Sequence, residues 1–147
     1  MNLEDVTVSE ANEVLKTIKG DALDIEIQFA PTKAESFGIN VRTTDDLVES
    51  TKIYYDNTKQ GLYVNRLHSS LKSGKKNVVG DAYAYKGDLN LRILLDRSLI
   101  EVYANNERSL TARIYPSLPD AQGLSMFAEN GDVRIEKLTI NSMASIY

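Results

Sequence analysis

The chain of 147 residues carries a formal net charge of −4, and 42% of its residues are hydrophobic and 26% charged. This composition fits one globular domain and excludes a disordered chain, while the acidic balance excludes the basic stripe of a nucleic-acid-binding protein. The sequence has no cysteine, which excludes disulfides and thiolate sites, and its apolar runs are too short to span a membrane.

The first predicted element is a short helix over residues 9–18. Ser9 can cap its first turn, and Val14, Leu15 and Ile18 follow at the spacing of an apolar stripe. The residues before it are acidic and polar, the opposite of a secretory signal. Helical patterning is confined to this segment, so little helix is expected.

From residue 22 onward the dominant period is two. Apolar residues alternate with polar ones at Leu23, Ile25, Ile27 and Phe29, and then at Phe37, Ile39 and Val41. This alternation predicts antiparallel strands with one buried and one solvated face. Residues 50–67 predict a hairpin whose turn lies at residues 57–61.

The segment 89–116 predicts two successive hairpins. If residues 96–99 form the first turn, the apolar residues of its strands meet without a slip in parity: Leu95 with Ile100, Ile93 with Val102, and Leu91 with Ala104. Aspartate at the head of a tight turn commonly accepts a backbone N–H from two residues on. Asp96 is therefore expected to accept the N–H of Ser98.

The second hairpin, turning through residues 105–109, determines which residues face each other across its strands. Its predicted register places Glu101 directly opposite Arg113 on the outer face. Opposite charges at such a position contribute roughly 0.2–1 kcal/mol. The segment therefore has a structural explanation for both of its prominent acidic residues, Asp96 and Glu101.

The last two predicted strands cover residues 123–129 and 132–140 and meet at Asn130-Gly131, a strong hairpin signal. Val133 and Ile135 have the opposite parity to Leu138 and Ile140, so a bulge is expected between the two pairs. About nine or ten strands with little helix predict an all-β fold, a two-sheet antiparallel β-sandwich of the concanavalin-like or lectin-like jelly-roll kind.

Asp96 and Glu101 are also candidates for a catalytic pair, because glycosidases use two carboxyl groups to break a sugar bond. Three interpretations are open: a turn residue with a cross-strand ion pair, a sugar-binding patch, or a catalytic dyad. The structural interpretation is preferred. The dyad is least favoured, because a neighbouring Arg113 would keep Glu101 ionised, which does not suit a general acid.

Other residues offer weaker candidates. His68 is the single histidine and has no partner for a metal site, so neither a metal nor a cofactor is expected. The basic run after it, which includes Lys72 and Lys75, fits a solvated loop better than a phosphate site. Tyr83 and Tyr85 are the tyrosines least committed to a core, and they are expected to meet a ligand or a partner.

The segment 91–116 resembles the C-terminal β-sandwich of glycoside hydrolase family 32, which includes invertases, levanases, inulinases and sucrose-6-phosphate hydrolases. The shared pattern falls on Asp96, Ser98, Glu101, Tyr103, Thr111, Arg113, Tyr115 and Pro116. Residues 36–46, 51–70 and 133–147 resemble further segments of the family in the same order. One departure is Asn65, which replaces the aspartate that precedes Arg66 in the family and weakens any role for that carboxylate.

The resemblance implies an accessory domain without catalytic residues. In the family, catalysis belongs to an N-terminal five-bladed propeller with Asn-Asp-Pro-Asn, Arg-Asp-Pro and Glu-Cys motifs. The three prolines here, at positions 31, 116 and 119, follow Ala, Tyr and Leu, so none belongs to an Asp-Pro motif. Residues 1–147 are therefore expected to form one accessory β-sandwich domain of a fructosidase without its propeller, and Met1 is not expected to be the natural start.

Two functions remain open. A structural and interface domain would pack on the propeller of the same polypeptide and take part in a homodimer, and the apolar outer-face residues Leu94, Leu99 and Phe127 favour this function. A fructan-binding module would instead hold fructose-ended sugars. Its candidate binding residues are Arg66, Asp96, Glu101, Arg113 and Tyr115.

The cellular location and the substrate are less determined by this sequence. The absence of cysteines and of Asn-x-Ser/Thr acceptors favours a bacterial cytoplasmic parent enzyme, with secretion as the alternative. The parent's substrate, whether sucrose, sucrose 6-phosphate, inulin or levan, would be selected in the propeller.

Overall fold

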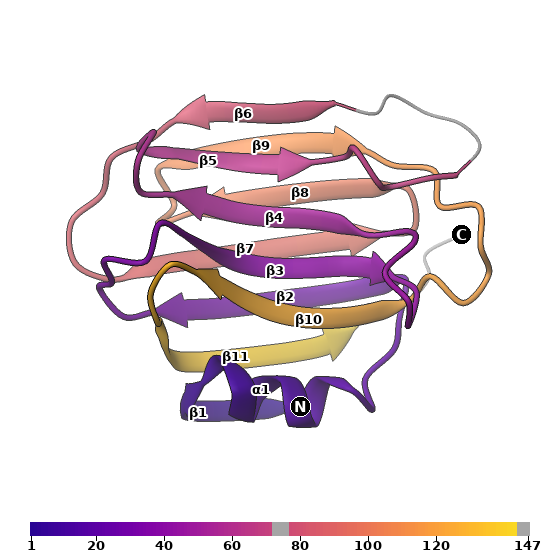
Figure 1. Cartoon of the computed structure of the whole chain (residues 1–147), viewed down its shortest axis with the longest axis horizontal. Coiled ribbons are helices and arrows are strands. Elements are labelled where there is room, and N and C mark those ends of the chain that lie inside the picture. The colour runs from indigo at the N-terminus through magenta and orange to yellow at the C-terminus, as the bar shows by residue number, and fades with distance from the viewer. Residues whose placement is uncertain (72–76, 144–147) are drawn as a thin grey trace.

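The computed structural model describes residues 1–71 and 77–143, which form a sandwich of two antiparallel sheets with eleven strands and one helix in these ranges (Figure 1). The six-stranded sheet has the order β1-β11-β2-β7-β8-β9. Its strands are β1 (Asn2–Thr7), β11 (Arg134–Ser142), β2 (Ala22–Phe29), β7 (Leu89–Asp96), β8 (Leu99–Ala104) and β9 (Arg108–Arg113). The predicted all-β sandwich is confirmed.

The five-stranded sheet has the order β10-β3-β4-β5-β6. Its strands are β10 (Gly123–Glu129), β3 (Ser36–Thr43), β4 (Thr51–Asp56), β5 (Gly61–Asn65) and β6 (Val78–Ala82). The single helix of the described residues, α1 (Val8–Leu15), lies beside β10 and β1 at the lower edge of the sandwich in Figure 1.

The core lies between the sheets and is built from the inward-facing residues of the alternating strands. Phe29 of β2 and Phe37 of β3 meet edge to face across it, with ring centroids 4.9 Å apart. Burial of such side chains contributes about 1.5–3 kcal/mol each, so this alternation supplies most of the driving force for the fold. The largest fully buried side chains include Phe29, Phe37, Leu15, Ile25, Ile39, Ile53, Leu62, Leu89, Leu91, Ile93, Leu95 and Ile100.

One predicted hairpin has the register that the sequence predicts, and a second predicted hairpin is present with a turn one residue shorter. The β7–β8 pairs are Leu95 with Ile100, Ile93 with Val102, and Leu91 with Ala104. The β4–β5 hairpin closes between Asp56 and Gly61, and Gln60 in its turn adopts φ 54°. The matching alternation of β7 and β8 determines their register, since a slip of one residue would expose an entire apolar face.

The predicted register of the β8–β9 hairpin is wrong by two residues. Glu101 lies opposite Thr111, and Arg113 lies opposite Leu99. The turn is tighter than expected, because Asn105 and Asn106 both adopt left-handed φ angles, of 51° and 55°. Asparagine tolerates this conformation better than most residues. Glu101 and Arg113 therefore share the outer face without facing each other.

The predicted hairpin at Asn130-Gly131 is also wrong. β10 pairs with β3, whereas β11 pairs with β1 and β2, so this connection carries the chain from one sheet to the other (Figure 1). Asn130 has φ 52° and Gly131 has φ 142°, which suits a sharp reversal. A turn signal shows that the chain reverses, but the flanking strands need not pair with each other.

The expected bulge in the last strand is confirmed. The register of β11 against β2 shifts between Ile135 and Lys137. Ile135 and Leu138 are both fully buried, although their positions differ by three, which in a regular strand would put them on opposite faces. The bulge also allows β11 to fit between β1 and β2, where it pairs with both strands.

The N-terminal region differs from its prediction. The helix begins at Val8, and Thr7 rather than Ser9 caps it, through a capping box in which Thr7 Oγ1 accepts the Glu10 N–H at 3.1 Å and Glu10 Oε1 accepts the Thr7 N–H at 3.0 Å. β1 was not predicted, because its inward residues Leu3 and Val6 lie three positions apart. The left-handed Asp5, at φ 53°, turns both to the same side.

Candidate functional site

An open groove of about 790 Å³ runs over the outer face of the six-stranded sheet. Its floor comes from β11, β2, β7 and β8, and one wall comes from the β8–β9 turn. Most of its lining side chains are polar or charged, and one is aromatic. They are Glu26, Gln28, Lys86, Asp88, Asn90, Arg92, Tyr103, Asn105, Asn106, Glu107 and Lys137, beside the backbone of Ile27 and Leu91.

Arg92 lies at the centre of the floor, between Glu26 of β2 and Tyr103 of β8. Its guanidinium donates to both carboxylate oxygens of Asp24, at 3.2 and 2.9 Å, and lies 3.8 Å from Glu26 Oε1. The hydrogen bonds and charge of Asp24 raise the pKa of Arg92 above its ordinary value. The groove therefore contains a fixed cation with two carboxylates beside it.

Tyr103 supplies the aromatic surface of the groove and is 36% exposed. Its hydroxyl donates to Glu101 Oε2 at 2.8 Å, and this hydrogen bond raises the pKa of Tyr103. The bond fixes the ring beside Arg92, its cross-strand partner on β7. Glu101 thus lies next to the groove, where it orients the tyrosine.

The wall of the groove is held in place by Asn105. Its backbone N–H donates to the Asn90 carbonyl at 2.8 Å, and its side-chain Oδ1 accepts the Asn90 N–H at 2.7 Å. Behind the same turn, Glu107 accepts the Tyr83 hydroxyl at 2.7 Å. These bonds tie the turn to β7 and to the other sheet, so the wall is preformed.

Gln28 joins two carboxylates at the far side of the groove. Its amide donates to Asp88 Oδ2 at 2.7 Å and to Glu136 Oε2 at 3.0 Å. Partial burial and the nearby charge of Asp88 raise the pKa of Glu136. In the described ranges, no group of His, Cys, Asp and Glu side chains has the arrangement of a metal site.

This arrangement suits a hydroxyl-rich ligand. Carboxylates and amides accept and donate to hydroxyl groups, an exposed tyrosine ring can stack on a sugar face, and a shallow sheet surface leaves much of the ligand in water. It does not suit glycoside hydrolysis, because the two carboxylates that flank Arg92 are kept close to a permanent cation. The groove is therefore a candidate binding site.

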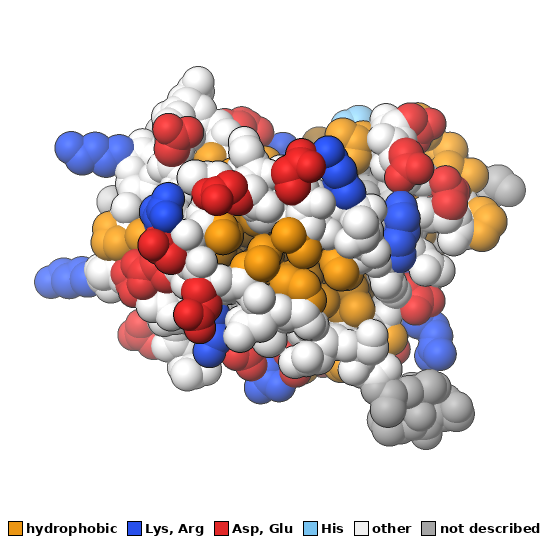
Figure 2. Space-filling model, turned by 90° about the horizontal axis from the view of Figure 1, so that it is seen from below, with side chains coloured by type: hydrophobic (Ala, Val, Ile, Leu, Met, Phe, Trp, Pro, Cys, Tyr) orange, Lys and Arg blue, Asp and Glu red, His pale blue; other side chains and the backbone are white. Residues whose placement is uncertain are grey.

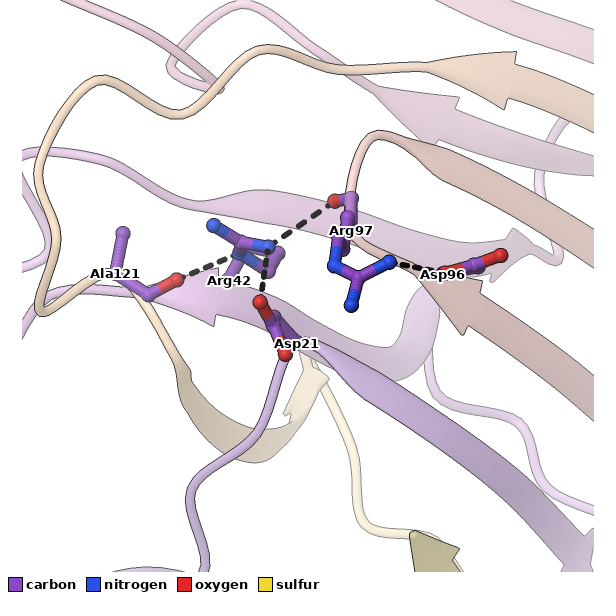
Figure 3. A network of polar contacts seen from close by, with 5 residues as sticks. All are labelled: Asp21, Arg42, Asp96, Arg97 and Ala121. Carbon is purple, nitrogen blue, oxygen red and sulfur yellow. Dashed lines mark hydrogen bonds and ion pairs between the residues drawn. The ribbon is translucent and has the colours of Figure 1, made fainter. Parts of the chain in front are cut away.

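Asp96 belongs to a polar network that links the two sheets, shown in Figure 3. Arg42 of β3 donates to the carbonyls of Ala121, at 2.7 Å, and of Arg97, at 3.1 Å, and it lies 4.0 Å from Asp21. Asp96 contacts Arg97 at 3.9 Å. Among the described residues, the structure has no hydrogen bond from the Ser98 N–H to Asp96, and the Arg97 N–H of the same turn donates to the Asp21 carbonyl at 2.6 Å.

The remaining predicted site residues do not form one site. Arg66 is almost fully buried and donates to the carbonyl of Arg113 at 3.0 Å and to Asn77 Oδ1. This makes Arg66 a link between the sheets. Tyr115 is exposed in the loop after β9. Asp96, Glu101 and Arg113 share the outer face of the six-stranded sheet, but the groove is centred on Arg92 and Tyr103.

The expectation for Tyr83 and Tyr85 is wrong. Tyr83 is buried, and Tyr85 packs against the core and meets Tyr55 edge to face at 4.8 Å. The Tyr55 hydroxyl donates to the Tyr83 carbonyl at 2.7 Å. These rings close one end of the core, and burial raises the pKa of Tyr85 to about 12. The basic residues Lys72 and Lys75 lie outside the described residues.

The apolar residues expected to form one interface lie on different sheets. Leu94 and Leu99 are on the outer face of β7 and β8, whereas Phe127 is on β10. Phe127 packs at 6.4 Å against the ring of Tyr54, and Lys52 lies 4.5 Å above it. A single flat partner surface cannot cover all three residues.

Sequence patterning did not single out Glu49, which is fully buried. Its carboxylate accepts the backbone N–H groups of Leu71, Ser117 and Leu118 and the Ser117 hydroxyl, at 2.5–3.0 Å. Burial alone would raise the pKa of Glu49, but these hydrogen bonds outweigh it and hold the pKa below its ordinary value. Glu49 joins three loops at one end of the sandwich.

Residues 2–142 match the family described as the C-terminal region of glycosyl hydrolases family 32. The chain is 32% identical to a levanase from Bacillus subtilis, in an alignment that covers 98% of this chain and 22% of the levanase. It is 30% identical to a fructan beta-fructosidase from Streptococcus mutans, covering 100% of this chain and 10% of that protein.

The fold also matches a solved structure. The crystal structure of exo-inulinase from Aspergillus awamori aligns with a TM-score of 0.81 at 26% identity, over 99% of this chain and 27% of that one. The chain thus spans between a tenth and about a quarter of the length of these relatives. In the part of the chain that the structure describes, no helix is long and apolar enough to cross a membrane.

Proposed function

The chain belongs to the C-terminal family of the family 32 glycosyl hydrolases, and from this membership we propose that it is the accessory domain of a larger β-fructofuranosidase-type enzyme. The observation that carries the proposal is the match of residues 2–142 to a family that occupies only 10–27% of its longer relatives. The parent polypeptide would hydrolyse sucrose, sucrose 6-phosphate or a fructan in an N-terminal propeller, and this domain would stabilise that propeller.

In this proposal the chain has no hydrolytic activity of its own. Asp96 lies beside Arg97, and Glu101 accepts the Tyr103 hydroxyl, so neither carboxyl group has the apolar surroundings that a general acid needs. The test is incubation of the purified chain with sucrose, inulin and levan. Release of fructose that disappears in Asp96→Asn would refute the proposal.

We further propose that the chain acts as one domain. All the described strands belong to the two sheets that share one core, which supports a single cooperative unfolding transition. Two separate calorimetric transitions would contradict this. Participation in a homodimer is a secondary proposal, and sedimentation equilibrium of the parent polypeptide tests it.

The location of the parent is proposed from composition. The absence of cysteines supports the bacterial cytoplasm. An exo-inulinase of Aspergillus awamori that aligns with this chain is named extracellular, which supports secretion instead. Fractionation of the source cells, with an antibody against this chain, distinguishes the two locations.

A second function, binding of fructose-ended sugars, is favoured by the groove. An arginine, carboxylates and an exposed tyrosine converge in it, as a carbohydrate site requires. The groove is shallow and has a single aromatic surface, so we expect dissociation constants of roughly millimolar or weaker.

Titration calorimetry with levan and inulin oligosaccharides tests this function. Binding should be lost in Tyr103→Ala and Arg92→Met, which remove the ring and the cation of the groove. Tyr115→Ala is the control, because Tyr115 is also an exposed tyrosine but lies outside the groove. Absent heat at millimolar sugar, or equal loss in the control, would leave only the structural function.

A further inference from the structure

We propose that a pocket at one end of the sandwich, distinct from the groove, binds a single neutral sugar ring. The pocket has a volume of about 240 Å³. It lies among the loops that join β2 to β3, β4 to β5 and β6 to β7, at the left end of the molecule in Figure 1. We name it the end pocket and define it by its lining residues, which are Pro31, Thr32, Tyr55, Asn57, Gln60, Ala84, Tyr85 and Gly87. This site adds to the accessory function and does not depend on it.

Two tyrosines supply the aromatic surface of the end pocket. The rings of Tyr55 and Tyr85 meet edge to face, with centroids 4.8 Å apart, and the Tyr55 hydroxyl is fixed by donating to the Tyr83 carbonyl at 2.7 Å. Sequence patterning placed Tyr85 outside the core, whereas its ring packs against the core and leaves only part of the side chain to line the pocket. An aromatic surface held in this way can pack against the C–H groups of a sugar ring.

Polar groups that can bind sugar hydroxyls belong to the same pocket. The Asn57 amide donates to the carbonyls of Thr32, at 3.2 Å, and Ala34, at 2.6 Å, so its Oδ1 is available as an acceptor. Among the described residues, neither this oxygen nor the Tyr85 hydroxyl nor the Gln60 side-chain amide has a hydrogen-bond partner. A partly buried hydroxyl normally has one, and a ligand hydroxyl would supply it for Tyr85.

The end pocket is uncharged, unlike the rest of the surface. Figure 2 shows charged side chains around the apolar centre of the face seen from below, and the groove itself contains Arg92 and Glu26. None of the described residues that line the end pocket is charged. Burial raises the pKa of Tyr85 to about 12, so its hydroxyl stays neutral at physiological pH. Because an unpaired charge is costly to bury, the pocket favours a neutral sugar over a phosphorylated one.

The size of the end pocket limits its ligand to one ring. A water molecule occupies about 30 Å³ in the liquid, so the pocket has room for about eight of them. That space suits a monosaccharide, and an oligosaccharide would extend beyond it. A single ring buries little surface, so we expect a dissociation constant of roughly millimolar size.

Hydrogen bonds between the loops hold the end pocket in shape. The Asn57 N–H donates to the Glu35 carbonyl at 2.8 Å and ties the β4–β5 turn to the β2–β3 loop. The Tyr83 N–H donates to the Gln60 carbonyl at 2.9 Å and ties the same turn to the β6–β7 loop. The pocket is therefore preformed, which reduces the entropy lost when a ligand binds.

The end pocket and the groove share a loop but no lining residue. In the loop between β6 and β7, Tyr85 and Gly87 line the end pocket, whereas Lys86 and Asp88 line the groove. Successive residues of this loop thus serve different sites. The two sites can therefore be distinguished by which residues respond to a ligand.

An NMR titration of the isotope-labelled chain with fructose tests the proposal. Fructose is the probe because every substrate proposed for the parent contains it. We expect saturable shifts at millimolar fructose in the backbone amides of Asn57, Gln60 and Gly87, and at least fivefold weaker binding of fructose 6-phosphate. The proposal is overturned by equal affinity for the phosphate, by shifts confined to the groove wall at residues 105–107, or by no saturable shift at roughly 100 mM fructose.

A matched pair of tyrosine variants gives a second test. Tyr85→Phe removes the hydroxyl of the pocket and keeps the ring in the core, so the affinity for fructose should fall at least fivefold while the melting temperature is kept. Tyr54→Phe is the control, because Tyr54 is also partly buried but stacks on Tyr63 and does not line the pocket. Equal affinities of the two variants would contradict the proposal.

The end pocket and the accessory function fail in different ways. A chain that binds no fructose at the end pocket refutes the pocket and leaves the accessory function intact. A parent polypeptide that releases no fructose from sucrose or fructan refutes the accessory function, whatever the isolated chain binds.

Discussion

Replacement of Glu49 by glutamine should destabilise the domain more than its single-atom change suggests. The carboxylate accepts hydrogen bonds from three backbone N–H groups and one hydroxyl. Glutamine has the same shape but offers one acceptor oxygen, and its NH2 group would meet donors in place of the other oxygen. At least one buried backbone N–H, that of Leu71 or of Leu118, would then lack an acceptor.

The magnitude follows from the number of bonds affected. A hydrogen bond to a charged group contributes about 1.5–3 kcal/mol, and a buried donor without a partner costs about 1–3 kcal/mol. Part of this loss is offset, because the neutral glutamine does not carry the free-energy cost of burying a charge. We therefore expect a loss of about 3 kcal/mol in the free energy of unfolding of Glu49→Gln.

Urea denaturation at pH 7 measures this loss. The control is Glu13→Gln, since the Glu13 side chain is 72% exposed and contacts Lys16 in a surface ion pair. Its effect should stay within about 0.5 kcal/mol. A loss below about 1 kcal/mol in Glu49→Gln would refute the conclusion that this carboxylate holds the three loops together.

The same residue predicts a pH dependence. The pKa of Glu49 in the folded chain lies below its ordinary value of 4.5, so its contribution is fully present above that pH. The contribution is lost as the pH falls through the lower, folded value. Below pH 4.5 the stability of the unsubstituted chain should therefore fall more steeply than that of Glu49→Gln, and parallel curves would contradict this.

Two further substitutions test local features by thermal denaturation. Thr7→Ala removes the helix cap and should cost about 1 kcal/mol, and an unchanged melting temperature would contradict the capping box. Gly38→Ala should cost about 3 kcal/mol, because the new Cβ would lie 2.0 Å from the Ile53 carbonyl oxygen of the neighbouring strand. Gly80→Ala is its comparison, since there the obstacle is the Tyr63 side chain, which can move, and the loss should be smaller.

The alternating strands were predictable because burial of one face imposes a period of two on the sequence. Leu91, Ile93 and Leu95 show this period and were placed in the correct register against β8. The same rule failed for β1, where Asp5 interrupts the period between Leu3 and Val6. A left-handed residue in a short edge strand removes the alternation by which the strand would be recognised.

The errors at turns have a different cause. The Asn130-Gly131 turn was identified correctly as a reversal, but the strands on either side belong to different sheets. Residues 105–107 form a tighter turn than expected, and the pairing of Glu101 therefore changed. Local sequence specifies the backbone of a turn, whereas the partner of each strand depends on distant parts of the chain.

The groove could not be predicted for the same reason. Gln28, Arg92 and Tyr103 are each an outward-facing residue of an alternating strand, as any solvated residue would be. The β7–β8 hairpin pairs Arg92 with Tyr103, but only the order β11-β2-β7-β8 brings Gln28 beside them, and it joins β2 and β11 to strands far away in sequence. Glu49 was missed because nothing nearby in sequence distinguishes a buried glutamate from an exposed one.

The place of β11 between β1 and β2 constrains how the chain can fold during synthesis. Of the described strands, β11 is synthesised last, and it is the strand that joins the first two strands of its sheet. Until it arrives, β1 has no neighbour and β2 has an open edge, both available to other chains. Completion of the sheet must therefore wait for residues 134–142, and a ribosome stalled before residue 134 should display a chain sensitive to proteolysis at its N-terminal strand.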